Sequence, residues 1–514
     1  MTASEEPVIV QPVDSASARA DAWGLTAVVV FGVLAGIGLR LFAYVSSLGT
    51  LDGDEAVWGL MARHFQQGEF SAFFWGQGYG GTQEVLATVP LVALFGTSTE
   101  VIRAVPLVCT AVAAVLVWRI GRRTVGEPAA RIAAVFFWVW PPYLVWKSDR
   151  AHGFYGSGLV FICLILLLVL RLAERRSRVD AALLGLVLGL GWWQTPQVVP
   201  IAVPALAWLL WKQREIWRDA WIVLPVAVLA ALPWLLSNIA HDWWSFDVDS
   251  GQTPYPTRLR GFFSATFPMA LGLRVPFTSE WPLGKVLSAV AYGALIVLFV
   301  IAWWRRRSSP SGLLFGIVAA FPFLYALSPS TWLVDEPRYV VVLLPVIALL
   351  VAQAMTTVWR AAVAIAAAAA LSLLVLWHLT SAPAFVERAD GLFVPVDFDP
   401  VIAELDRRGL EHVFASYWPA YRISFETGER IVAAEARLPT LADRNGRVLP
   451  RVPRKYDESR HPAYDTVVRA DPNAGFVVLL RRERGSVLVR RVLKRAGYVR
   501  SVVDGFAIYG PPRR

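Results

Sequence analysis

Long apolar segments recur along most of this chain and constrain its fold more than any other feature. Most are roughly 17–25 residues long, the length that an α-helix needs to cross a bilayer. Apolar residues make up 56% of the 514 positions and charged residues only 17%, a composition typical of membrane proteins. We predict a polytopic α-helical membrane protein with about eleven transmembrane helices. The predicted segments lie at about 24–45, 101–118, 128–146, 154–172, 181–195, 198–211, 219–237, 285–304, 312–327, 339–358 and 361–379.

Basic residues gather after every second apolar segment. Cytoplasmic loops of membrane proteins carry such an excess of arginine and lysine, so these connections are predicted to be cytoplasmic. The N-terminal tail, 1–23, then lies in the cytoplasm, and an odd number of spans places the C-terminus outside. Arginine far outnumbers lysine, which indicates a GC-rich bacterial genome, so we predict the plasma membrane of a bacterium. The net charge of +10 does not indicate a nucleic-acid partner, because membrane topology itself requires basic loops. The clusters are Arg119, Arg122 and Arg123; Arg171, Arg175, Arg176 and Arg178; Lys212, Arg214 and Arg218; Arg305, Arg306 and Arg307; and Arg360.

The outer connections are longer and chemically richer. The first, about 46–100, contains an acidic start, a helical stretch at 55–67, a Gly-rich run at 76–81 and an apolar segment at 85–96. The apolar segment is too short to span a bilayer and is predicted to be re-entrant or interfacial. The second large outer connection is at about 238–284.

The composition changes at Ser381, where polar, charged and Pro-containing sequence begins and continues to the end. The stretch 399–408 has a helical pattern, whereas 412–415 and 476–480 read as strands. We therefore predict three parts: a cytoplasmic tail at 1–23, a transmembrane catalytic domain at 24–380 and an extracytoplasmic soluble α/β domain at 381–514.

Three carboxylates, Asp52, Asp54 and Glu55, follow the first apolar segment at the predicted outer face. An Asp before a helix is a good N-cap, and acidic residues favour a first helical turn, so Asp52 has a purely structural alternative. A carboxylate at this position can also act as a general base or hold a divalent cation.

The order of these features resembles the GT-C superfamily of membrane glycosyltransferases, near the protein O-mannosyltransferase and aminoarabinose-transferase branch (glycosyltransferase family 39-like). In that superfamily an outer Asp-Glu pair opens an amphipathic helix after the first span, and an Arg-Tyr element precedes a later helix. The extra Asp52, the Gly-rich run and the C-terminal domain depart from the pattern and leave the acceptor open. The matching pieces are Asp54-Glu55, Gly59-Leu60-Met61-Ala62-Arg63, Phe95-Gly96, Arg103, Pro337-Arg338-Tyr339 and Pro345.

The resemblance implies a polyprenyl-phosphate sugar donor, an outer-face active site and Asp54 as the general base, with Glu55 and Asp52 beside it. A lipid phosphate needs cations, and arginine supplies a permanent charge on a planar fork. For Arg338, an ion pair with Asp335 or Glu336 is the structural alternative. The predicted phosphate-binding residues are Arg338, Tyr339, Lys147, Arg150, Arg258 and Arg260.

Contacts to the sugar or acceptor are predicted for Asp149, His152, Trp75, Tyr79 and Glu84. The alternatives are an exposed Asp149–Arg150 pair and, for the aromatic residues, anchoring at the membrane interface. The sequence has no HxxxH or CxxC pattern, so a zinc site has little support. We expect no required cofactor, although Asp52 and Asp54 suit Mg²⁺ or Mn²⁺ if a divalent cation is used.

The predicted reaction is inverting transfer of a hexose or pentose from a polyprenyl-phosphate sugar to a hydroxyl of a glycan, lipid or protein. Lipid phosphate is a good leaving group, so the protein must deprotonate the acceptor and stabilise the departing phosphate. A transporter or flippase of a lipid-linked sugar is the main alternative, because carboxylates in membrane proteins also mark ion paths. A non-catalytic protein of cell-envelope assembly is the other.

Overall fold

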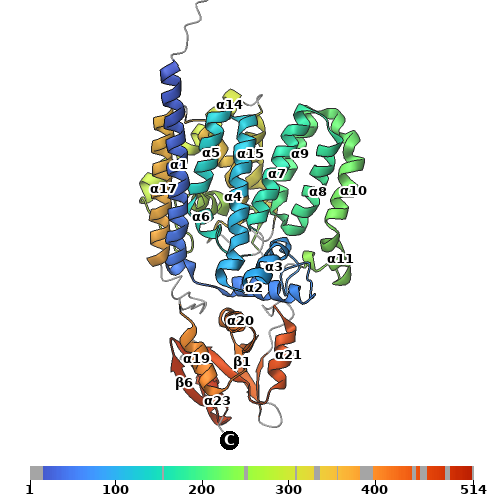
Figure 1. Ribbon diagram of the computed structural model, residues 1–514, viewed down its shortest axis with the longest axis vertical. Coiled ribbons are helices and arrows are strands. Elements are labelled where there is room, and N and C mark those ends of the chain that lie inside the picture. Colours follow the sequence, from blue (N-terminus) through green and yellow to red (C-terminus); the bar gives the residue numbers. More distant parts are fainter. Residues whose placement is uncertain are drawn as a thin grey trace, which may run out of the picture.

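The computed structural model describes residues 15–152, 155–247, 253–306, 310–328, 336–355, 357–381, 397–442, 447–451, 460–480 and 487–511. A bundle of helices forms the larger part, and a smaller α/β domain lies at one end of it (Figure 1). The helices up to the end of the bundle are α1 (Ser15–Val45), α2 (Gly53–Gln66), α3 (Gln83–Phe95), α4 (Thr99–Thr124), α5 (Glu127–Val139), α6 (Pro142–Lys147), α7 (Tyr155–Glu174), α8 (Arg178–Gln194), α9 (Val199–Lys212), α10 (Ala220–Ala230), α11 (Leu232–Ala240), α12 (Tyr255–Gly261), α13 (Phe267–Ala270), α14 (Lys285–Arg306), α15 (Gly312–Leu327), α16 (Leu344–Ala352) and α17 (Val358–Ser381).

Every apolar segment predicted from the sequence contains a helix, as expected for a multi-pass membrane protein. Among the described residues, four helical stretches are long and apolar enough to cross a bilayer: Ala22–Val45, Thr99–Thr124, Tyr155–Glu174 and Val358–Thr380. A pair bent by 56° after Ala230 makes a fifth if it forms one span. The number of eleven crossings therefore stays a prediction.

Proline explains where one predicted span is interrupted. The segment at 128–146 is two helices, α5 and α6, separated at Trp140 and Pro141. Trp140 has an extended backbone, with φ −149° and ψ 149°. A residue that precedes proline is pushed out of the helical region, because the proline ring crowds its backbone. The chain therefore leaves the helix at Trp140 and restarts at Pro142.

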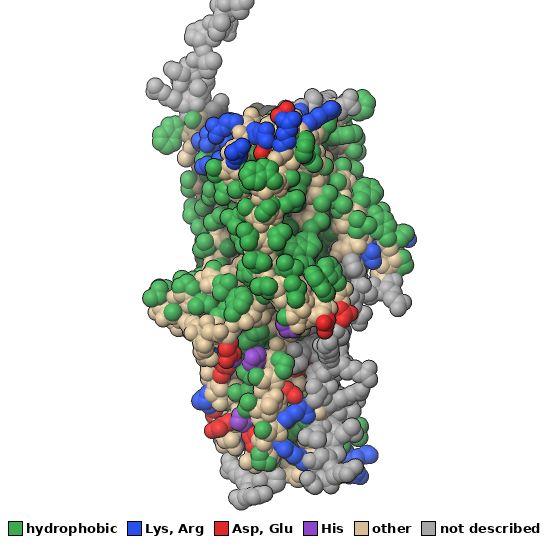
Figure 2. Space-filling view, turned by 90° about the vertical axis from the view of Figure 1, so that its right-hand side faces the viewer, with side chains coloured by type: hydrophobic (Ala, Val, Ile, Leu, Met, Phe, Trp, Pro, Cys, Tyr) green, Lys and Arg blue, Asp and Glu red, His purple; other side chains and the backbone are tan. Residues whose placement is uncertain are grey.

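The two ends of the bundle differ in charge. Figure 2 shows Lys and Arg side chains gathered at one end of the helix bundle, the end that lies away from the α/β domain. The last turn of α4, with Arg122 and Arg123, belongs to this basic set. Helix α1 starts at the same end, whereas α2 and α3 lie at the opposite end, between the bundle and the domain (Figure 1).

The C-terminal domain is built on a five-stranded sheet of order β2-β1-β5-β7-β6. Strands β2, β1 and β5 are parallel, and β7 and β6 continue the sheet in antiparallel fashion. The helix predicted at 399–408 is α19, and the strands predicted at 412–415 and 476–480 are β1 and β5, so these expectations are confirmed. The elements are α19 (Asp399–Arg408), β1 (His412–Ala415), α20 (Tyr417–Glu426), β2 (Val432–Glu435), β3 (Arg437–Ala442), β4 (Val448–Arg451), α21 (Pro462–Ala470), β5 (Gly475–Leu479), α23 (Val487–Arg495), β6 (Val499–Val503) and β7 (Phe506–Gly510).

Helix α2 joins the bundle to this domain by packing against α20. Its buried residues form one hydrophobic cluster with Tyr417, Tyr421, Phe425 and Tyr464 of the domain. A Cβ atom on Gly59 would lie 2.0 Å from the ring of Phe425, so only glycine allows the two helices this close approach. The start of α2, where the acidic residues lie, is thereby held against the C-terminal domain.

Candidate active site

Asp52 is the N-cap of α2. Its Oδ1 accepts a hydrogen bond from the backbone N–H of Glu55 at 3.0 Å, as a capping carboxylate does. Its Oδ2 lies 2.8 Å from Nε2 of His152 and 3.2 Å from Nη2 of Arg150. Burial alone would raise the pKa of Asp52, but His152 and Arg150 hold that pKa well below its usual range. Asp52 is thus an ionised cap with both oxygens in use.

Glu55 lies in a buried ion-pair network. Its side chain is fully buried, and Arg103 binds it with Nε at 2.8 Å and Nη2 at 2.6 Å. Nη2 of Arg150 is 2.6 Å from Oε2, and the N–H of Ala151 donates to Oε1 at 3.0 Å. Burial opposes ionisation, yet the two arginines lower the pKa of Glu55. Because both of its oxygens have partners, Glu55 is suited to positioning the acidic corner, the group formed by Asp52, Asp54 and Glu55. It is not suited to contacting substrate.

Asp54 faces the C-terminal domain. Its side chain is 38% exposed, compared with 21% for Asp52 and 0% for Glu55. The hydroxyl of Tyr417 donates a hydrogen bond to Oδ1 of Asp54, and Nη2 of Arg460 lies 4.0 Å from the same oxygen. Arg460 also donates to Oε1 of Gln77 in the Gly-rich run, at 2.7 Å. A cation and a phenol from the C-terminal domain therefore adjoin the carboxylate.

Arg338 lies just before η7 (Val341–Leu343) and forms an ion pair with Glu336, the pair that the sequence left as an alternative. Asp335 lies outside the described residues. The Nε of Arg338 is buried without a hydrogen-bond partner in the described part of the chain, although 36% of the side chain is exposed. The guanidinium carbon of Arg338 lies 6.0 Å from the ring centroid of the neighbouring Tyr339. Arg338 thus combines a fixed position with unused hydrogen-bonding capacity.

The other predicted phosphate-binding cations have different surroundings. Arg150 is buried, and besides its acidic partners it donates to the carbonyls of Leu48 and Thr50, both at 2.7 Å. With this set of partners, Arg150 holds the acidic corner in place. Arg258 donates to the carbonyl of Ala326 at 2.8 Å, which ties α12 to the end of α15, and Arg260 is exposed on α12.

Lys147 and His152 lie together beside Asp52. Nζ of Lys147 is 3.2 Å from Nδ1 of His152, and Lys147 also lies over the ring of Trp146 at 4.1 Å. Burial and the charge of Lys147 lower the pKa of His152 despite its bond to Asp52. A neutral ring that carries its proton on Nε2 satisfies both contacts, because it accepts from Lys147 at Nδ1 and donates to Asp52 at Nε2.

Asp149 is also buried, and its Oδ1 atom has no hydrogen-bond partner among the described residues. Burial raises its pKa to about 6, even though neighbouring arginines, Arg150 foremost, favour the ionised form. The alternative of an exposed pair with Arg150 does not hold, because Asp149 and Arg150 are only 8% and 4% exposed.

The remaining residues predicted to contact the sugar or acceptor, Tyr79, Trp75 and Glu84, differ in how far their side chains are exposed to solvent. The side chain of Tyr79 is 43% exposed, so it is accessible to a ligand. Trp75 is buried and stacks on His461 with ring centroids 4.1 Å apart, which leaves little of its face for a sugar. Glu84 is also buried, and its Oε1 accepts from the N–H and hydroxyl of Ser157 at 2.7 and 2.5 Å.

The structure adds Arg460 and Gln77 to the residues around Asp54, and it places Tyr417 there as well. In the sequence Tyr417 belongs to an aromatic cluster best explained by core packing, and part of its ring does pack in the interface with α2. No local pattern in the sequence around Arg460 predicts its approach to Asp54, because this approach depends on how the C-terminal domain packs against the bundle.

This arrangement of bundle, outer junction and α/β domain is similar to crystal structures of ArnT from Cupriavidus metallidurans. The apo structure matches with a TM-score of 0.63 at 12% sequence identity, covering 94% of this chain and 98% of ArnT. The structure of ArnT bound to undecaprenyl phosphate matches with a TM-score of 0.60, at the same identity and coverage. No curated protein gives a significant sequence match.

The fold is that of the GT-C membrane glycosyltransferases, in agreement with the resemblance that the sequence shows. Within the superfamily, residues 89–239 match the family described as dolichyl-phosphate-mannose-protein mannosyltransferase. The matched range runs from α3 to α11. The acidic corner, Arg338 and the C-terminal domain lie outside it, so their roles rest on geometry.

Proposed function

We propose that this protein transfers a monosaccharide from a polyprenyl-phosphate sugar to an acceptor hydroxyl at the outer face of the membrane, with Asp54 as general base. The observation that supports this most directly is the difference in bonding and exposure among the three carboxylates of the acidic corner. Asp52 and Glu55 are held by hydrogen bonds and ion pairs, whereas Asp54 keeps the largest exposed fraction of the three. A base must reach the proton that it removes, and the exposure of Asp54 supports this role.

In the proposed step, the acceptor oxygen attacks the anomeric carbon and Asp54 takes the hydroxyl proton. The bond from that carbon to the phosphate oxygen breaks, and the polyprenyl phosphate leaves with the electron pair. A single displacement of this kind inverts the anomeric centre. Arg338 and Tyr339 would stabilise the negative charge on the leaving phosphate, which is the work of a preorganised cation. The proposed step draws on no cofactor, although the carboxylate of Asp54 would also suit a Mg²⁺ or Mn²⁺ ion.

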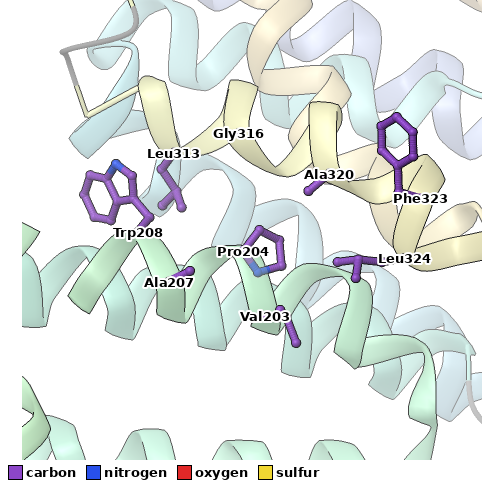
Figure 3. A pocket seen from close by; sticks show the side chains of 9 residues that line it. All are labelled: Val203, Pro204, Ala207, Trp208, Leu313, Gly316, Ala320, Phe323 and Leu324. Atoms are coloured by element: carbon purple, nitrogen blue, oxygen red, sulfur yellow. The ribbon is translucent and has the colours of Figure 1, made fainter. Parts of the chain in front are cut away.

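The lipid chain of the donor needs an apolar surface within the bundle. An open groove of about 450 Å³ lies between α9 and α15 and is lined almost entirely by apolar atoms (Figure 3). It extends along α15 from Leu313 to Leu324, towards the end at which Arg258 binds Ala326. ArnT, with the same fold, binds undecaprenyl phosphate. We propose that the polyprenyl chain lies in this groove with its phosphate towards the outer end.

The charge distribution favours one orientation in the membrane. The basic end of the bundle would face the cytoplasm by the positive-inside rule. The acidic corner and the C-terminal domain lie at the opposite end and would then be extracytoplasmic, in the plasma membrane of a bacterium (Figure 1). A long domain can be translocated whatever its charge, so the arginine content of the C-terminal domain does not oppose this orientation.

The test is a transfer assay with the full-length protein in nanodiscs. It offers radiolabelled undecaprenyl-phosphate hexoses and pentoses together with glycan, lipid and peptide acceptors. The proposal expects transfer with at least one pair, and its loss in Asp54→Asn. Transport of the lipid-linked sugar across sealed vesicles without transfer to any acceptor would overturn the proposal in favour of a flippase.

A further inference from the structure

A second polar cluster lies where the last turn of α2 meets the C-terminal domain, whereas Asp54 lies in the first turn of the same helix. It contains His64 and Glu69 from the first outer connection and His461 from the C-terminal domain. One potential ligand atom from each of the three lies within 4.8 Å of the other two. The proposed transfer reaction uses none of these residues.

His64 has the environment of a metal-binding histidine. Its Nδ1 lies 2.6 Å from Oε2 of Glu69, and its Nε2 lies 2.8 Å from Oε1 of Glu429. Histidines that bind metals usually donate their second ring N–H to a carboxylate, which fixes the tautomer and the ring orientation. Glu429 is held in turn by Nη1 of Arg63 at 3.0 Å and by the hydroxyl of Tyr464 at 2.6 Å.

His461 approaches the same point from the other domain. Its ring lies 5.0 Å from the ring of His64, centroid to centroid, and stacks on Trp75 at 4.1 Å. The ring of Tyr464 packs edge-on against it at 4.6 Å. Two aromatic side chains thus fix the plane of His461, as rigid support of a ligand requires.

We propose that His64, through Nδ1, together with Glu69 and His461, binds one Zn²⁺ ion that joins α2 to the C-terminal domain. Two imidazoles and one carboxylate are a donor set that zinc uses, with water in the fourth position. Ligand atoms in a tetrahedral zinc site lie about 3.4 Å apart, given bonds of about 2.0–2.1 Å. The three groups here lie within 4.8 Å of one another, so their side chains would shift to reach that spacing on binding the ion.

The site also has a route for the ion. The side chain of Glu69 is 59% exposed, so zinc and its water ligand can reach the cluster from solvent. Binding would release the proton that His64 and Glu69 share, because ligands must be deprotonated. Mg²⁺ prefers oxygen ligands and octahedral geometry, so it should not compete at a site with two imidazoles.

Zinc would have a structural effect at this position. His461 follows Arg460 directly in the chain, and Arg460 reaches Asp54 and Gln77. A bond between the metal and His461 would therefore restrict the segment that carries Arg460 and hold the domain closed over the acidic corner. This consequence does not depend on which sugar or acceptor the protein uses.

The test measures zinc binding by the full chain in nanodiscs, purified without a polyhistidine tag and stripped with a chelator. ZnCl₂ is titrated against a chromophoric competitor, and bound metal is counted by mass spectrometry. The expected result is one tight zinc per chain, no saturation with MgCl₂, and slower amide exchange in α2 and α21 on adding zinc. Glu69→Gln and His461→Ala should each weaken binding by more than about 100-fold, and Glu429→Gln by about 10–100-fold.

The matched control is His412→Ala, which removes a histidine paired with Asp471 in the same domain, away from the cluster. It should bind zinc like the unmodified chain. Glu69 is largely exposed, so its Gln variant should fold even if His461→Ala does not. The proposal is overturned if the unmodified chain shows no saturable site, or if Glu69→Gln binds zinc with unchanged affinity.

Discussion

The hydroxyl of Tyr417, in the C-terminal domain, donates a hydrogen bond to Oδ1 of Asp54, in the first turn of α2. The bond joins two regions that are distant in the sequence and makes the C-terminal domain part of the wall around the proposed base. Arg460 lies beside the same oxygen and extends this contact to Gln77. The domain is therefore placed to influence the chemistry at Asp54 directly.

Replacing Asp54 with Asn should lower kcat by about 10²- to 10⁴-fold, the usual contribution of a general base. The amide keeps the size of the side chain but cannot accept the proton at neutral pH. Single-turnover transfer measures the effect, and donor binding should change little. Asp242→Asn, in an exposed outer turn, is the control and should keep full activity. Normal turnover by Asp54→Asn would remove Asp54 from the mechanism.

Replacing Arg338 with Ala should weaken the binding of undecaprenyl phosphate by about 10- to 150-fold, since a charge-assisted hydrogen bond contributes about 1.5–3 kcal/mol. Glu336→Gln separates phosphate binding from simple ion pairing, because it removes the partner of Arg338 but keeps the guanidinium. That variant should bind the lipid at least as well as the unmodified chain. Equal affinity of Arg338→Ala and the unmodified chain in direct titration would assign Arg338 to the ion pair alone.

Replacing Arg460 with Ala should lower kcat/KM for the acceptor by about 10-fold or more, which corresponds to the loss of one charge-assisted contact. Donor affinity should stay unchanged, because the proposed phosphate site lies on the bundle. Arg460→Lys should restore part of the activity by keeping the charge. Arg430→Ala, which breaks an exposed pair with Asp406 in the same domain, is the control. An equal loss in both Ala variants would indicate a general effect on the domain.

Replacing Glu55 with Gln should destabilise the fold by about 3–5 kcal/mol, because it leaves Arg103 and Arg150 buried without their shared counter-charge. The melting temperature in nanodiscs measures the change. Glu127→Gln breaks exposed pairs with Arg122 and Arg131 and should cost at most about 1 kcal/mol. A melting temperature for Glu55→Gln as high as that of the control would mean that the buried network does not stabilise the corner.

Replacing Asp149 with Asn should stabilise the protein at neutral pH but not in acid. Burial raises the pKa of Asp149 in the folded chain to about 6, whereas the ordinary pKa of an aspartate is 3.8, so between these pH values the folded chain holds a proton that the unfolded chain has lost. Stability therefore falls as pH rises through this window, by up to about 3 kcal/mol for a shift of about two units. The melting temperature of Asp149→Asn should exceed that of the unmodified chain at pH 7.5 and approach it near pH 4. A difference independent of pH would contradict the assignment.

Local patterns in the sequence predicted much of the secondary structure. Helix α19 and strand β1 have the predicted bounds, and the cap alternative for Asp52 is the arrangement that the structure shows. Such features depend on residues a few positions apart, through side-chain periodicity and hydrogen bonds to the nearest backbone groups. The interruption at Trp140 was missed because the apolar pattern continues through the two prolines that end the helix.

The sequence by itself determined that this chain is a multi-pass membrane protein with a polar C-terminal domain, because apolar length and charge placement report directly on the bilayer. Only the tertiary structure decided what each carboxylate does. Glu55 is neutralised by Arg103 and Arg150, and Asp54 is left facing Tyr417 and Arg460. These contacts form when α20 packs on α2 and when the loop after α6 reaches the acidic corner. They join residues far apart in the chain, and no local pattern encodes them.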